Sequence, residues 1–217
     1  MKFTEGYWLL SERTNGQFAS QAYRIEAMEN GLRVVAPTSP VLSRGDTLNR
    51  PTITIEFLAV SPEVISVRAW HYEGYRTGEA RFEKKETTCD AVVTITENEA
   101  VLDAGRVSVH VDRKNWGYSF WADGKLLTSS GFRNIGYVRW DRSVSSMLPQ
   151  DNYMKEHAYT PYMTQDLLLA PGENVYGFGE RFTAFVKNGQ VVETWNEDGG
   201  TASQVAYKNI PFYISNK

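Results

Sequence analysis

The sequence has one cysteine, three histidines and no long apolar run, and each scarcity excludes a class of protein. The lone Cys89 cannot form an internal disulfide, and no cysteine or histidine cluster has the spacing of metal ligands. No apolar stretch is long enough to span a bilayer, and the N-terminal residues lack the pattern of a secretory signal. We therefore expect a soluble, cytoplasmic protein without a metal or other cofactor.

An excess of positive charge is also lacking, because 23 basic and 26 acidic residues leave a formal net charge of -3. The densest basic spot, Lys84 and Lys85, is flanked by Glu83 and Glu86. A nucleic-acid surface would need a basic stripe or patch, so the sequence predicts no nucleic-acid partner and no membrane partner. Aromatic residues make up 13% of the chain, which suits both core packing and the stacking of sugar rings.

What the sequence has in quantity is short runs of alternating apolar and polar residues, which predict half-buried strands in antiparallel sheets. In TITIEF, Ile53, Ile55 and Phe57 fall on one face, and the valines of RVSVHVD do the same. No window keeps a period of 3.6 residues for three turns, so little helix is expected. Further strands are predicted at residues 22–28, 31–37, 64–72, 91–97 and 166–170.

Turn residues separate these runs. Asp123-Gly124 and Asn30-Gly31 both predict tight hairpins, because such pairs adopt positive φ easily. The prediction is an all-β, antiparallel β-sandwich of a dozen or more strands in one unit, less regular around residues 142–154. The apolar ending NIPFYISNK reads as a strand that runs into the last residue, so we expect a chain truncated inside a sheet.

Few residues invite a catalytic interpretation. The three histidines lie far apart in the sequence, and none belongs to a pattern of nucleophilic catalysis, so each is expected to be an ordinary structural or surface residue: His71, His110 and His157. Glycosidases commonly use two carboxyl groups, and VVETWNEDGG offers Glu193, Glu197 and Asp198. Spacing alone gives this motif little weight as a catalytic pair.

The glycines of VYGFGERF, Gly177 and Gly179, lack the third glycine and following helix of a dinucleotide site, and the lysine ending of a phosphate loop. A tightly packed or bulged strand explains them better. Glu180 and Arg181 are then expected at the strand end, where an ion pair could fix the loop that follows.

Residues 175–213 as a whole resemble the end of the N-terminal domain of glycoside hydrolase family 31, and within it the bacterial α-xylosidase type. The motifs that carry the resemblance occur in order: YGFGERF, KNGQVVETWNEDGGT and AYKNIPFY. Weaker similarity extends over essentially all of the chain, from GYWLL near its start, and residues 139–163 align least well.

The resemblance implies a galactose-mutarotase-like supersandwich at residues 1–217, followed in family members by a catalytic (β/α)8 barrel that this chain does not contain. The family's enzymes are retaining exo-α-glycosidases whose nucleophile and acid/base are both aspartates of the barrel. No catalytic residue is therefore expected here. The chain by itself is expected to be inactive, with its own catalytic barrel as partner and α-xylosides or α-glucosides as substrates.

In the family a loop of the sandwich helps to form the substrate site, and the resemblance places it at residues 187–206. Asp198 maps onto a sugar-contacting aspartate. Asn196 would orient the loop or the sugar, and Trp195 would either stack on a sugar ring or anchor the loop in the core. Gly199 and Gly200 would let the loop approach a ligand closely.

Three alternatives stay open. The chain could be a free-standing carbohydrate-binding or lectin-like sandwich, an α-glucosidase domain of the same family, or an aldose epimerase with a histidine and a glutamate as acid and base. An apolar docking face left uncovered would also be compatible with a homo-oligomer.

Overall fold

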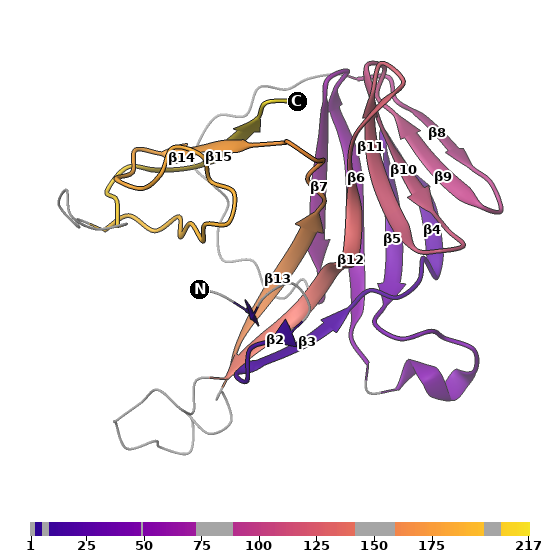
Figure 1. The fold of residues 1–217 in the computed structure, drawn as a ribbon. Helices are drawn as coiled ribbons and strands as arrows, with labels where there is room; N and C mark the ends of the chain where they lie inside the picture. The colour runs from indigo at the N-terminus through magenta and orange to yellow at the C-terminus, as the bar shows by residue number, and fades with distance from the viewer. Residues whose placement is uncertain (1–2, 6–8, 49, 73–88, 142–158, 198–204) are drawn as a thin grey trace. The chain divides into compact units, whose positions relative to one another are not determined.

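The computed structural model describes residues 3–5, 9–48, 50–72, 89–141, 159–197 and 205–217 (Figure 1). The chain divides into two compact units, one of residues 12–168 and the other of residues 1–11 and 169–217. The described regular structure is almost entirely antiparallel strand, as the alternating sequence predicts. Its one helical element is a 3₁₀ turn, η1 (Arg44–Thr47), which the sequence analysis did not predict, and no described helix is long and apolar enough to cross a membrane.

The larger unit is a sandwich of two sheets, seen as two layers of arrows in Figure 1. Four strands in chain order form one sheet: β4 (Arg24–Met28), β5 (Gly31–Pro37), β6 (Thr52–Ser61) and β7 (Val64–Trp70). The seven-stranded sheet has the order β13-β12-β11-β10-β9-β8, with β3 also paired to β12. Its strands are β3 (Thr14–Phe18), β8 (Val92–Ile95), β9 (Glu99–Asp103), β10 (Val107–Asp112), β11 (Gly117–Ala122), β12 (Lys125–Asp141) and β13 (Tyr159–Leu167).

The smaller unit contains two pairs of strands. A short pair joins β1 (Thr4–Glu5) to β2 (Leu9–Leu10), and a ribbon joins β14 (Val175–Gly179) to β15 (Asn209–Ser215).

The core of the larger unit lies between its two sheets. Ile53, Ile55 and Phe57 are completely buried, which confirms the face predicted from TITIEF. The Phe57 ring lies 5.4 Å from that of Tyr118 and 6.3 Å from that of Phe120, so one β6 side chain contacts the opposite sheet at two places. Burial raises the pKa of Tyr118 to about 12, and Gln165 donates a hydrogen bond to its hydroxyl.

Glu56 is buried on the other face of β6, where the alternating pattern predicts a solvated side chain. Cross-strand pairing places Glu26, Arg33, Glu56 and Arg68 in one row across the four strands, with alternating charge. Arg33 donates to Oε1 of Glu56 from Nε at 3.0 Å and from Nη2 at 2.7 Å, while Arg68 lies 3.9 Å from Oε2. The flanking guanidinium groups satisfy the buried carboxylate and so make its burial tolerable.

Strand β12 pairs with β11 over residues 125–129 and with β3 over residues 136–140, and its pairing with β13 shifts register between Ser130 and Ile135. Arg133 has a φ of 60° there. The buried Asn134 accepts hydrogen bonds from Nε1 of Trp116 at 3.1 Å and from the Ile135 amide at 2.7 Å. The second bond satisfies a backbone amide at the irregularity, and the first satisfies the Trp116 indole.

The two predicted hairpins differ in detail. Asp123 and Gly124 have φ of 49° and 72°, which confirms the turn between β11 and β12. At the other hairpin Asn30 has a φ of 57°, but Gly31 is already the first residue of β5. A Cβ on Gly31 would lie 2.6 Å from the Phe57 carbonyl oxygen, so this glycine serves close strand packing rather than the turn.

Of the strand predicted at 166–170, only the first two residues lie in a strand, because β13 runs from Tyr159 to Leu167. Leu168 beyond it still donates its amide to the Ser129 carbonyl at 2.9 Å and accepts a hydrogen bond from the Thr128 hydroxyl. The whole irregular segment predicted at 142–154, and His157, lie outside the described residues.

Replacing Phe57 with Ala should lower the free energy of unfolding by about 3–5 kcal/mol, because it leaves a cavity between the two sheets. Urea unfolding followed by circular dichroism measures this. Leu42→Ala, at a side chain that is 90% exposed, is the control and should change stability by less than about 0.5 kcal/mol. A loss below about 1 kcal/mol for Phe57→Ala would contradict the central role of this ring.

Candidate functional site

The candidate site lies in the smaller unit, where the ribbon of β14 and β15 supports the segment 180–197. The ribbon depends on two glycines. Gly177 and Gly179 have φ of 113° and 85°, and the register shifts between them. A Cβ on Gly179 would lie 2.3 Å from the Lys208 carbonyl oxygen, and one on Gly177 would lie 2.7 Å from that of Phe212. The predicted bulged, tightly packed strand is therefore confirmed.

Asn209, the first residue of β15, connects three parts of the site. Its amide N–H donates to Oδ1 of Asn196 at 3.0 Å. Its side-chain Nδ2 donates to the Trp195 carbonyl at 2.6 Å, to the Ala206 carbonyl at 2.7 Å and to Oδ1 of Asn196 at 3.0 Å. Its Oδ1 accepts a hydrogen bond from Arg181. The Asn209 side chain thus holds residues 195–196 and Ala206, the two ends of the loop, to the ribbon.

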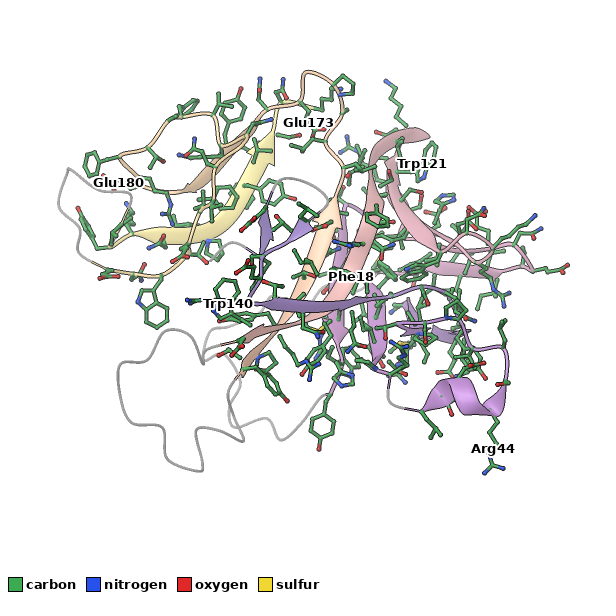
Figure 2. The ribbon with its side chains drawn as sticks, turned by 60° about the horizontal axis from the view of Figure 1, so that its bottom comes forward. Phe18, Arg44, Trp121, Trp140, Glu173 and Glu180 are labelled. Carbon is green, nitrogen blue, oxygen red and sulfur yellow. The ribbon has the colours of Figure 1, made fainter. Side chains whose placement is uncertain are left out.

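Arg181 fixes the other side of this loop. Its guanidinium donates to the Phe178 carbonyl from Nε at 3.1 Å and to the Glu193 carbonyl from Nη2 at 2.6 Å. The ion pair predicted from Glu180 and Arg181 is wrong in its partner, because Glu180, labelled in Figure 2, pairs with Lys208 at 3.6 Å. Both of those side chains are 63% exposed, so Arg181, with its carbonyl partners, is the stronger anchor.

The Lys187 side chain folds back and bonds the turn at residues 183–184. Its buried ammonium donates to the Thr183 hydroxyl at 2.9 Å and to the Ala184 carbonyl at 2.7 Å. Desolvation, followed by the positive charge of Arg181, holds the pKa of Lys187 below its ordinary value. Asn188 ties the same turn to β14, accepting from the Val175 amide at 2.8 Å.

A hollow of about 280 Å3 lies beside Arg181 in the surface of the smaller unit. Its walls carry Arg181, Glu193, Trp195 and Glu197, together with apolar side chains of residues 191, 192 and 205. The Trp195 side chain is 74% exposed, so the prediction that it could anchor the loop in a core is wrong. An exposed indole beside carboxylates and a guanidinium can offer an apolar face and hydrogen-bonding groups to one ligand.

The other predicted site residues have different outcomes. Asn196 accepts two hydrogen bonds from Asn209, which fits the prediction that it orients the loop. Asp198 lies outside the described residues, and so do Gly199 and Gly200. Glu193 and Glu197 both line the hollow.

The two described histidines are ordinary surface or partly buried residues in paired strands or beside them. His71 Nδ1 lies 3.1 Å from the Thr52 carbonyl oxygen, and His110 Nδ1 lies 2.9 Å from Glu99 Oε1. In the described part of the chain no three cysteine, histidine or acidic side chains gather as a metal site would require.

Sequence reasoning missed Asn209 altogether. It occurs in the motif AYKNIPFY, which the resemblance singled out, but nothing local in the sequence assigns it a role. Its partners lie 3 to 28 residues away, so only the fold brings them together.

The ribbon also exposes a row of apolar side chains. The exposed fractions of Phe212, Tyr213 and Ile214 are 64%, 50% and 58%. Because neighbouring side chains point to opposite faces of a strand, both faces of β15 are uncovered here by the described residues. Exposed apolar surfaces commonly bind another part of a protein.

Comparison with known proteins gives a consistent family. The model of the "glycosyl hydrolase 31 N-terminal galactose mutarotase-like domain" matches residues 53–217. The chain is 39% identical to alpha-xylosidase XylQ of Lactiplantibacillus pentosus, with 99% of this chain and 26% of that protein covered. It is 35% identical to an alpha-xylosidase of Emericella nidulans, with 99% and 28% covered. The chain thus spans about a quarter of the length of the curated relatives it matches.

Solved structures agree on the fold at low sequence identity. The cycloalternan-forming enzyme of Listeria monocytogenes in complex with a pentasaccharide substrate is 14% identical, with a TM-score of 0.64 over 93% of this chain and 17% of that one. The GH31 dextranase of Flavobacterium johnsoniae in complex with glucose is 17% identical, with a TM-score of 0.56 over 93% and 21%.

Replacing Asn209 with Ala should release the loop, because it removes the side-chain bonds to Arg181, Trp195, Asn196 and Ala206. We expect hydrogen exchange of the Glu197 amide, which donates to the Ala206 carbonyl at 2.9 Å, to quicken about tenfold, equivalent to losing one or two net hydrogen bonds. Exchange measured by mass spectrometry or NMR tests this.

Asn216→Ala is the matched control, since Asn216 bonds the Asn174 amide at the opposite end of the ribbon and should leave the Glu197 amide unchanged. Equal exchange in the Asn209 variant and the unmodified chain would show that the loop is held by other contacts.

Proposed function

Since the chain belongs to glycosyl hydrolase family 31, as its N-terminal galactose mutarotase-like domain, we propose that it is the accessory sandwich of a retaining exo-α-xylosidase. The enzyme would remove α-xylosyl residues from non-reducing ends. The observation that carries this proposal is the 39% identity to an alpha-xylosidase over 99% of the chain, to which a second alpha-xylosidase adds 35%.

The chemistry of this enzyme belongs to a catalytic (β/α)8 barrel that follows in the full-length protein. Glycoside hydrolysis with retention needs two carboxyl groups on opposite sides of the scissile bond. In the candidate site the acidic side chains lie beside an exposed indole on an irregular loop, and Arg181 binds main-chain carbonyls there. This arrangement suits a surface that positions a substrate, and we assign no catalytic residue to this chain.

The segment 187–206 would contribute to the substrate site of the barrel. Three features support this role: a loop fixed at its base by Arg181 and Asn209, an indole at Trp195 that is 74% exposed, and a hollow beside it. Asp198 follows directly on this fixed part, and a carboxylate there would accept charge-assisted hydrogen bonds from sugar hydroxyls. Trp195 would stack on a sugar ring, and Asn196 would hold the loop.

The exposed apolar side chains of β15 would pack against the barrel. Phe212 and Ile214 alternate with Tyr213, so these two lie on one face of β15, and they offer an exposed apolar surface of the kind that domains bury on docking. The sequence also fits a soluble cytoplasmic enzyme without a metal. If the same face instead formed a homo-oligomer, a measurement of the molecular mass in solution would show it.

An α-glucosidase of the same family is the alternative, and the substrate decides between the two. The protein encoded by the full reading frame, assayed with p-nitrophenyl α-xyloside and α-glucoside, should release p-nitrophenol about tenfold or more faster from the xyloside, measured as kcat/KM. A preference for the glucoside would establish the alternative. Release from neither would overturn the glycosidase proposal.

In the same enzyme, Asp198→Asn and Trp195→Ala should each lower kcat/KM by about 10- to 100-fold, because each removes a sugar contact worth roughly 1–3 kcal/mol. Asp90→Asn, which changes an exposed carboxylate in the larger unit, is the control and should leave kcat/KM unchanged. Full activity in both loop variants would remove this segment from the substrate site.

A further inference from the structure

A second hollow, also of about 280 Å3, lies in the surface of the larger unit. It is lined by Asp103, Arg106, Ser108, His110, Trp121 and Asp123, which come from β9, β10, β11 and the turns that join them to their neighbours. None of these residues belongs to the three motifs that carry the family resemblance or to the proposed substrate loop.

The register of three strands brings these side chains to the outer face of the seven-stranded sheet. Ser108 pairs with Asp103 on one side and with Trp121 on the other, so the three side chains form one row. His110 lies two residues further along β10, on the same face. Val109 and Val111 alternate with them and are fully buried in the sandwich core, which fixes Ser108 and His110 on the outside.

A local irregularity in the strand pairing determines the direction of the Trp121 side chain. The pairing of β11 with β12 shifts register between Phe120 and Trp121, and bulges of this kind redirect side chains near binding sites. The Trp121 indole Nε1 donates to the Ser119 hydroxyl at 2.8 Å, and its ring lies 5.6 Å from the His110 ring at 50°. Figure 2 labels this side chain at the sheet. The indole is therefore held in place before any ligand arrives.

The imidazole beside it is equally fixed. His110 Nδ1 lies 2.9 Å from Glu99 Oε1, and Nε2 lies 3.2 Å from the Ser108 hydroxyl. With Nδ1 protonated and donating to the carboxylate, Nε2 of the neutral ring accepts the Ser108 hydrogen. Ser108 Oγ, which lines the hollow, then keeps both of its lone pairs for accepting hydrogen bonds.

The rim supplies charged groups of both signs. Asp103 Oδ1 accepts the Gly105 amide at 2.8 Å, which leaves Oδ2 for a ligand as far as the described residues are concerned. Arg106 and Asp123 face each other at 3.4 Å, with exposed fractions of 61% and 64%. A mixed rim disfavours a strongly charged ligand and suits an uncharged molecule with many hydroxyl groups.

We propose that this hollow is a carbohydrate-binding site for one neutral pyranose ring, with the ring packed on Trp121 and its hydroxyls bonded to Asp103, Ser108 and Arg106. Aromatic stacking provides the apolar contact that the C–H face of a sugar needs, and the carboxylate and guanidinium bond its hydroxyls. The volume is just below the usual range of small-molecule pockets, which suits a single ring. Because the side chains are already held by their neighbours, little ordering entropy is lost on binding.

The site goes beyond the proposed glycosidase function and does not depend on it. It uses residues of the larger unit, whereas the proposed substrate loop belongs to the smaller one. It would hold a non-hydrolysed sugar, such as another part of an oligosaccharide chain.

The test is an NMR titration of the 217-residue chain with methyl α-D-xylopyranoside and with maltotriose, with glycerol as a polyol that lacks a ring. We expect saturable shifts of the Trp121 indole N–H and of the amides at 103–110 and 119–124, with a dissociation constant of about 1–10 mM for one of the sugars. Glycerol should cause none.

Trp121→Ala should weaken binding at least about tenfold, and Asp103→Asn about three- to tenfold, since the amide can still accept the Gly105 N–H but loses the charge. Trp70→Ala on the other sheet is the matched control and should bind as before. If the Trp121 variant fails to fold, the Asp103 variant and the shift map still decide.

No saturable shift at these residues with either sugar would overturn the proposal, as would undiminished binding in both site variants. Shifts confined to residues 181–197 would also overturn it, while supporting the substrate loop. A failure of the glycosidase assay would leave this result untouched.

Discussion

Packing of Phe57 and its neighbours between two sheets is the constraint on which the larger unit depends. Ile53, Ile55 and Phe57 are fully buried, and a one-residue slip of β6 would turn all three outward and bring Glu56 in. The register of every neighbouring strand follows from this choice. So do the outer faces: the charge row through Glu56 on one sheet, and the row of Asp103, Ser108 and Trp121 on the other.

The smaller unit is held together in a different way. Its described part contributes one residue, Ala206, to the buried apolar side chains, while much of its apolar surface is exposed. Its loop depends instead on hydrogen bonds from Arg181, Asn209 and Lys187, and on a ribbon that only glycine permits at two positions. Each hydrogen bond of this kind contributes about 0.5–1.5 kcal/mol net to stability. The bonds fix the geometry of the loop, but the described part of the unit buries little apolar surface. A unit built in this way fits a role at the boundary with another domain.

Strand positions and the inward face could be predicted because period-two patterns and turn residues are local. Asp123-Gly124 and the bulge at Gly177 and Gly179 were found for the same reason. The burial of Glu56 could not be predicted, because its partners Arg33 and Arg68 lie on other strands. The roles of Asn209 and Trp195 were missed or left open for a similar reason, since both depend on contacts between segments more than ten residues apart. Where a property belongs to a pair across strands, the sequence offers no local signal.

The same distinction separates the two proposed sugar contacts. The loop site is assembled from main-chain carbonyls tied to a few side chains, and the substrate role proposed for it depends on a second domain. The sheet site is built on residues whose register is fixed by the core of their own unit, from Val109 and Val111 outward. The proposed sheet site therefore draws all its residues from the larger unit, whereas the role proposed for the loop depends on a catalytic domain. A side chain whose position is fixed by the core of its own unit can contact a ligand without another domain. A side chain held on a loop by a few hydrogen bonds depends more on what packs beside that loop.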